Sequence, residues 1–135
     1  MEEVPSNYKT AGIMMLIAGI MNILGAIVLG IVLFLYITGV AFATMGVGIL
    51  CYVCCLWPFV PLGWGIYELI VGMNVMNGKV VKNASTVSII GIVVGALNLG
   101  MGGVIPLVLE IIATVMFNND EVKAWIAEHD PELLT

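Results

Sequence analysis

Apolar residues form long stretches along the chain, and polar side chains interrupt these stretches at only a few positions. No Asp, Glu, Lys, Arg or His lies between residues 10 and 67 or between residues 83 and 109. Runs of more than about 18 apolar residues are typical of membrane-spanning helices. The whole chain is 61% hydrophobic and 10% charged, whereas soluble domains are about half apolar and a quarter charged. We therefore expect an all-α integral membrane protein.

The breaks between the apolar stretches predict four spans, at about residues 10–36, 47–77, 84–100 and 103–118. Five spans also fit the lengths, because residues 38–77 are long for a single helix. With four spans, all the lysines fall on one side of the membrane, namely Lys9, Lys79, Lys82 and Lys123. Because the excess of positive charge is found in cytoplasmic loops, the lysines favour a four-helix bundle with both termini in the cytoplasm.

This topology predicts a short cytoplasmic N-terminal tail (1–9) and a transmembrane domain (10–118) in the cell membrane. The second helix is expected to be kinked, because Pro58 and Pro61 lie inside it and proline removes a helical hydrogen bond. The uncharged residues 38–48 before it are expected to form an outer connection. We expect this connection to pack on the bundle, on lipid or on a neighbouring subunit.

The cytoplasmic tail (119–135) contains a second kind of pattern, with apolar residues at helical spacing and acidic residues between them. Val122, Trp125 and Ile126 fall on one face, which predicts an amphipathic helix. Because its other face is acidic, we expect the helix to dock along the base of the bundle or onto a neighbouring protomer.

The two halves of the transmembrane domain align with each other. The first helices pair Gly19 with Gly95, Asn22 with Asn98 and Ala26 with Gly102, and the second helices align on Glu68 and Glu110. Parallel repeats of this kind are known in membrane proteins. The alignment predicts two helical hairpins of common descent.

Small residues recur at helical spacing in the first and third spans. Since lipid gives helices no hydrophobic drive to associate, close backbone approach at small residues is expected to hold the bundle together. The predicted packing positions are Ala11, Ala18, Gly19, Gly25, Gly91, Gly95 and Gly102.

Four polar residues inside the spans are predicted to form one central layer: Asn22, Glu68, Asn98 and Glu110. Each glutamate lies nine residues from the inner end of its helix, or about 13–14 Å at 1.5 Å per residue, which is near the middle of a hydrocarbon core of about 30 Å. Desolvation penalises a charged carboxyl group, so we expect both glutamates to be protonated. Thr114 is placed to share a hydrogen bond with Glu110.

This layer has several interpretations. Polar contacts that fix the register of the helices are favoured, whereas a proton or cation pathway is the alternative, because ionisable residues within a membrane are functional candidates. A polar anchor for a lipid is a third interpretation.

Other chemistry has little support. Cys51, Cys54 and Cys55 have metal-site spacing but no fourth ligand nearby, so packing near the outer interface is the favoured role. The sequence contains no nucleophile with a base, no phosphate-binding loop and no basic patch for nucleic acid. We expect no enzymatic activity, no cofactor and no bound metal.

The arrangement "NYKTAGIMMLIAGIMNILGAI…WPFVPLGWGIYELIVG…NGKVVKNASTVSIIGIVVGALN…NNDEVKAWI" resembles small four-span prokaryotic membrane proteins of unknown function. The first helix, with "LIAGIMNILGAI", is similar to that of the membrane-spanning four-domain group of eukaryotic tetraspan proteins. This resemblance implies a four-span bundle that forms oligomers.

We therefore expect a non-enzymatic tetraspan that forms a homo-oligomer or serves as a structural or accessory subunit of a larger membrane-protein complex. The alternative is a small ion or proton channel or carrier that uses Glu68 and Glu110.

Overall fold

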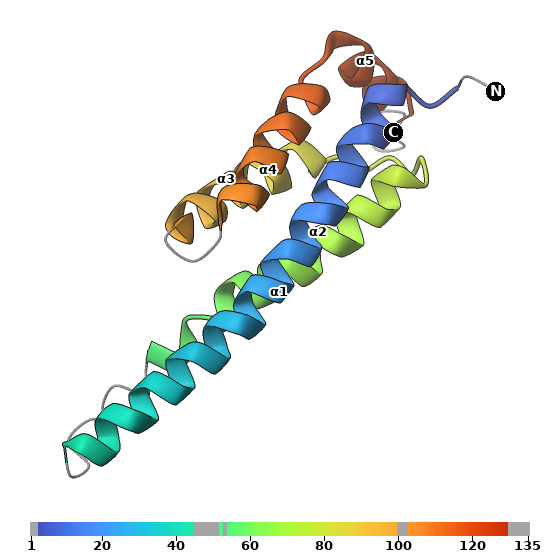
Figure 1. The fold of residues 1–135 in the computed structure, drawn as a ribbon. Helices are drawn as coiled ribbons and strands as arrows, with labels where there is room; N and C mark the ends of the chain where they lie inside the picture. Colours follow the sequence, from blue (N-terminus) through green and yellow to red (C-terminus); the bar gives the residue numbers. More distant parts are fainter. Residues whose placement is uncertain (1–2, 45–51, 53, 100–102, 130–135) are drawn as a thin grey trace.

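The chain forms an elongated set of helices in the computed structural model, which describes residues 3–44, 52, 54–99 and 103–129. These residues contain no strand, and their helices are α1 (Ser6–Ala43), α2 (Phe59–Met76), α3 (Ala84–Leu97), α4 (Val104–Phe117) and α5 (Asp120–His129). Figure 1 shows α2 alongside α1, and the α3–α4 hairpin beside the N-terminal half of α1. The prediction of an all-α fold is confirmed.

Among the described residues, two segments are long and apolar enough to cross a membrane, Ser6–Ala43 and Cys54–Met76. The helices α3 and α4 are also apolar but have 14 residues each. At 1.5 Å per residue each is about 21 Å long, which is shorter than a hydrocarbon core of about 30 Å. The described helices therefore differ in length more than the four predicted spans do.

The first helix is longer than its predicted span, which ended at residue 36. It continues through residues 38–43, which the sequence analysis assigned to an outer connection, so that assignment is wrong for these residues. The sequence has no proline or charge here that would end a helix, and the Thr38 hydroxyl donates to the Phe34 carbonyl oxygen one turn earlier at 2.7 Å. Residues 45–48 of the predicted connection lie outside the described residues.

Helix α2 begins later than the predicted second span, which started at residue 47. Helix α2 begins at Phe59, directly after Pro58, and Pro61 lies in its first turn. The first four N–H groups of a helix have no partner within the helix, so proline removes no hydrogen bond there. The prolines therefore mark the start of α2, and residues 54–56 before it form a 3₁₀ turn.

Helices α1 and α2 touch through glycines at two levels. A Cβ atom added to Gly19 would lie 2.7 Å from the Gly65 carbonyl oxygen, and one added to Gly12 would lie 3.0 Å from the Gly72 carbonyl oxygen. These separations are too small for a side chain, so backbone packs on backbone, as expected for helices that associate without a hydrophobic drive.

The other predicted packing positions have different surroundings. Ala11 and Ala18 are fully buried, and a Cβ atom on Gly95 would lie 3.1 Å from Leu107 of α4. Gly25 does not pack as predicted, since no atom of the described residues lies within 4 Å of an added Cβ there. Gly102 lies outside the described residues.

An aromatic cluster closes the base of the bundle, where Figure 1 shows the N-terminus and α5 together. The ring centroid of Tyr8 lies 5.8 Å from that of Phe117 and 5.0 Å from that of Trp125 in α5. The Tyr8 hydroxyl donates to the Lys79 carbonyl oxygen (2.8 Å) and accepts from the Val81 N–H (2.9 Å). Helix α5 therefore docks along the base of the bundle, one of its two predicted positions.

Candidate functional site

The polar residues predicted to share one layer all lie inside the bundle. Glu68 and Glu110 have no exposed surface, and Asn22 and Asn98 are also buried. A fifth polar residue, Ser88 of α3, is fully buried as well, and it was not among the residues predicted for the layer. Buried polar groups are costly unless they are hydrogen-bonded, so the bonds that each one makes are informative.

Both carboxyl oxygens of Glu68 accept hydrogen bonds. Asn22 of α1 donates through Nδ2 to Oε2 at 2.7 Å, and Trp64 donates through Nε1 to Oε1. Trp64 precedes Glu68 by one helical turn, so the two side chains lie on the same face of α2. The Asn22–Glu68 bond therefore links α1 to α2, and each carboxyl oxygen of Glu68 has one N–H donor.

Glu110 has a different environment. The Ser88 Oγ atom lies 2.5 Å from Glu110 Oε2 and 2.9 Å from the Glu110 carbonyl oxygen. Thr114 donates to Ser88 Oγ at 2.9 Å, so it reaches Glu110 through Ser88 rather than through the predicted shared bond. Within the described part of the chain, Glu110 Oε1 has no hydrogen-bond partner.

Gly91 of α3 separates the two carboxyl groups. A Cβ atom built on Gly91 would lie 2.5 Å from Glu68 Oε1 and 2.9 Å from the Glu110 carboxyl carbon. Both carboxyl groups therefore lie within 2.9 Å of one point. Any side chain at position 91 would displace them, so this glycine makes room for the pair.

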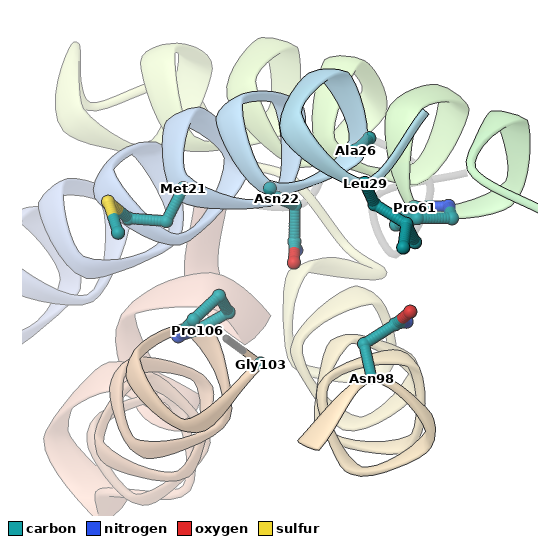
Figure 2. A pocket seen from close by; sticks show the side chains of 9 residues that line it. Met21, Asn22, Ala26, Leu29, Pro61, Asn98, Gly103 and Pro106 are labelled. Atoms are coloured by element: carbon teal, nitrogen blue, oxygen red, sulfur yellow. The ribbon is translucent and has the colours of Figure 1, made fainter. Parts of the chain in front are cut away.

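A small cavity lies beside the Asn22–Glu68 bond. Its volume is about 20 Å³, and its lining residues are Met21, Asn22, Gly25, Ala26, Leu29, Pro61, Asn98, Gly103 and Pro106. A water molecule needs about 10–15 Å³ of such space. Figure 2 shows the side chains of Asn22 and Asn98 pointing into the same space from facing helices.

Asn98 lines this cavity. Its Nδ2 atom donates to the Val94 carbonyl oxygen at 2.7 Å, and its Oδ1 atom has no hydrogen-bond partner among the described residues. The two asparagines therefore differ in role, because Asn22 binds a glutamate and Asn98 bonds to its own helix.

The internal alignment explains part of the difference between the two glutamates. Aligning Glu68 with Glu110 places Trp64 opposite Pro106, and proline has no N–H that could donate to the carboxyl group. The same alignment places Gly65 opposite Leu107, and both of these residues contact the glycine of the preceding helix, Gly19 or Gly95. The hairpins thus pack through corresponding positions, whereas the bonds to their glutamates differ.

The sequence analysis missed Trp64 and Ser88 as partners of the glutamates. The spacing of four residues between Trp64 and Glu68 was the available signal for the first. Ser88 gave a weaker signal, because its bond to Glu110 depends on how α3 and α4 meet in space.

The cysteines form no comparable cluster. Cys54 is exposed, Cys55 is half-buried, and both are free thiols, whereas Cys51 lies outside the described residues. The described part of the chain contains no group of three or more His, Cys, Asp or Glu side chains that could hold a metal ion.

Comparison with known proteins gives no assignment. No protein-family model, no curated protein and no solved structure matches the chain. The resemblance to small four-span membrane proteins therefore stays a prediction. A proposal of function rests on the geometry of the helices.

Proposed function

We propose that the protein is a non-enzymatic, multi-pass protein of the cell membrane that assembles with copies of itself as a structural or accessory subunit. The observation that carries the proposal is the apolar surface on the C-terminal half of α1. A surface of this kind has to be covered, either by lipid or by other helices.

The C-terminal half of α1 extends beyond the described part of the α3–α4 hairpin. The α3–α4 connection reaches α1 at the level of Asn22 to Leu29, where Asn98 and Gly103 share a cavity with α1. Beyond that level, large apolar side chains of α1 are more than half exposed, namely Ile31, Val32, Phe34, Leu35 and Phe42. With 38 residues, α1 is about 57 Å long and exceeds the thickness of a hydrocarbon core.

An apolar groove lies on the same half of the molecule. It has a volume of about 350 Å³ and is lined by Ala26, Ile27, Gly30, Ile31, Phe34, Cys55, Pro58, Phe59 and Leu62. A side chain or helix of a neighbouring subunit can pack into an apolar groove, and helices in membranes associate by such close packing. The groove therefore favours assembly over coverage by lipid alone.

The base of the bundle supports the proposed orientation. Figure 1 shows the N-terminus, the α2–α3 connection and α5 at one end of the molecule, and these segments carry Lys9, Lys79, Lys82 and Lys123. The four lysines favour this end as the cytoplasmic one.

Disulfide cross-linking of single-cysteine variants tests the assembly. The native cysteines are replaced by alanine, and one cysteine is introduced by Leu35→Cys on α1 or by Val115→Cys on α4 as a matched control. The two native side chains are equally exposed, at 64% and 67%. In dilute liposomes we expect oxidation to give covalent dimers of the Leu35→Cys variant and few dimers of the control.

Equal dimer yields from both variants would indicate random collision and would contradict the proposal. A failure of both variants to cross-link, together with a monomeric mass of the wild-type protein by native mass spectrometry, would contradict it as well.

A second candidate function is a small proton or cation carrier, and the burial of Glu68 and Glu110 in one cluster favours it. Flux through liposomes that contain the pure protein tests this function. Proton flux that the double substitution Glu68→Gln and Glu110→Gln abolishes would support the carrier. A wild-type protein that passes neither protons nor cations would contradict it.

A further inference from the structure

We propose that Glu68 and Glu110 together form a binding site for one proton, which Glu110 holds while Glu68 is ionised. This differs from the expectation of two protonated glutamates. The pair lies inside one chain, so its protonation does not depend on the assembly proposed above.

The bonds of Glu68 fit an ionised carboxylate. An ionised carboxylate can only accept hydrogen bonds, and a protonated carboxyl group also has to donate one. Both oxygens of Glu68 accept from N–H donors, Nδ2 of Asn22 and Nε1 of Trp64. Hydrogen bonds to the charged form of a carboxyl group favour that form. Glu68 is therefore the member of the pair whose charge the protein stabilises directly.

The bonds of Glu110 fit a protonated acid. Its Oε1 atom is buried without a hydrogen-bond partner among the described residues, and a negative charge there would be uncompensated. An unpaired buried charge is much more costly than an unpaired neutral oxygen, because a neutral carbonyl oxygen loses less on leaving water. Neutral Glu110 therefore suits this environment better than ionised Glu110.

The contacts of Ser88 agree with a proton on Glu110 Oε2. A serine hydroxyl has one proton to donate and two lone pairs that accept. Ser88 Oγ lies near three oxygens, the Glu110 carbonyl oxygen, Glu110 Oε2 and Thr114 Oγ1. If Ser88 donates to the carbonyl oxygen and accepts from both Thr114 and a protonated Oε2, all three contacts are satisfied at once.

The closeness of the two carboxyl groups limits the pair to one negative charge. Both groups lie against Gly91, within 2.9 Å of the position of a Cβ atom there. Two negative charges this close repel each other, so ionisation of one carboxyl group disfavours ionisation of the other. The first proton therefore binds to the pair, and its affinity is a property of both groups together.

The side chains that face the pair carry no charge of their own. Among the described residues they come from all four packed helices: Asn22 of α1, Trp64 of α2, Ser88 and Gly91 of α3, and Thr114 of α4. Proton binding therefore sets the net charge of this cluster. In the uptake step, hydronium transfers its proton to a Glu110 oxygen, where one O–H bond forms, and a water molecule is released.

Isotope-edited infrared spectroscopy tests the proposal on the full-length protein in lipid nanodiscs at neutral pH. Carbon-13 labelling of glutamate separates the acid C=O band of the seven glutamates from all other carbonyl bands. The band of the same sample at low pH, where every glutamate is protonated, calibrates the amplitude for seven groups. We expect the band at neutral pH to have one seventh of that amplitude.

Two substitutions then assign the band. Glu110→Gln is expected to abolish it, and Glu68→Gln is expected to retain it, whereas Glu121→Gln on the exposed surface of α5 serves as a control that leaves it unchanged. The number of protonated glutamates comes from the wild-type protein alone, so this part of the test does not require the variants to fold.

Three outcomes would overturn the proposal. A wild-type spectrum without an acid band would show two ionised glutamates, and a band of two sevenths would show two protonated ones. A band that Glu68→Gln abolishes and Glu110→Gln retains would place the proton on the wrong residue.

Discussion

Asn22 of α1 donates a 2.7 Å hydrogen bond to Glu68 of α2, and both side chains are buried between the helices. The bond lies within one helical turn of the contact between Gly19 and Gly65. A polar bond and a backbone contact thus fix the same register between the two helices, and a shift of either helix by one turn would break both.

Removing the donor of this bond should weaken the bundle. Asn22→Leu leaves one Glu68 oxygen buried with no donor, which typically costs about 1–3 kcal/mol. We expect a free energy of unfolding lower by about that amount, measured by denaturation of the detergent-solubilised protein. Asn118→Leu, at an exposed position after α4, should change stability much less. Equal effects of the two substitutions would contradict a role for the Asn22–Glu68 bond.

Gly91 should tolerate no larger residue. In Gly91→Ala the new methyl group would lie 2.5 Å from Glu68 Oε1, so the carboxyl pair has to move. Overpacking of this kind typically costs about 1–3 kcal/mol. The matched control is Gly63→Ala in α2, where no described atom lies within 4 Å of the added carbon. Because alanine favours a helix over glycine by about 1 kcal/mol, the control should be neutral or stabilising.

Two glycines of α1 should respond differently to the same change. Gly19→Ala places a methyl group 2.7 Å from the Gly65 carbonyl oxygen and should force α1 and α2 apart. Gly25→Ala adds its methyl group where the described residues leave 4 Å free, and it should be tolerated. Thermal denaturation of both variants in one detergent checks the difference. A lower midpoint for Gly25→Ala than for Gly19→Ala would contradict the described helix contact.

The hydroxyl group of Tyr8 should protect a backbone amide far away in the sequence. Tyr8→Phe removes the acceptor of the Val81 N–H and the donor to the Lys79 carbonyl oxygen. We expect faster hydrogen exchange at Val81 and a loss of about 1–3 kcal/mol, because a buried group loses its partner. Tyr36→Phe on the exposed surface of α1 is the control and should leave the exchange at Val81 unchanged. Unchanged exchange at Val81 in Tyr8→Phe would contradict the bond.

Burial of the polar residues could be predicted from the sequence, because a carboxyl group inside a long apolar stretch has to avoid lipid. Their partners could be predicted only in part. Trp64 lies on the same helix as Glu68, so its position follows from helical spacing, whereas the contact between Ser88 and Glu110 depends on the rotation of two helices about their axes.

The two errors in helix bounds have different causes. The first span was ended at residue 36, and the uncharged residues after it were assigned to a connection. The local sequence contains no stop signal there, and α1 continues to Ala43. At the second helix, prolines were interpreted as a kink inside a span, although proline is equally compatible with a helix start, where the structure places it.

The Tyr8 contact also bears on the order in which the protein assembles during synthesis. Its two backbone partners follow it in the chain by 71 and 73 residues. At translation rates of about 5–20 residues per second, those partners are synthesised roughly 4–15 seconds after Tyr8. Until α2 with Gly65 and Gly72 has emerged, the glycine face of α1 is open to other newly made helices, including the first helix of a copy on the next ribosome. The contacts of Tyr8 with Lys79 and Val81 therefore form only after the period in which α1 can pack against a helix of another chain.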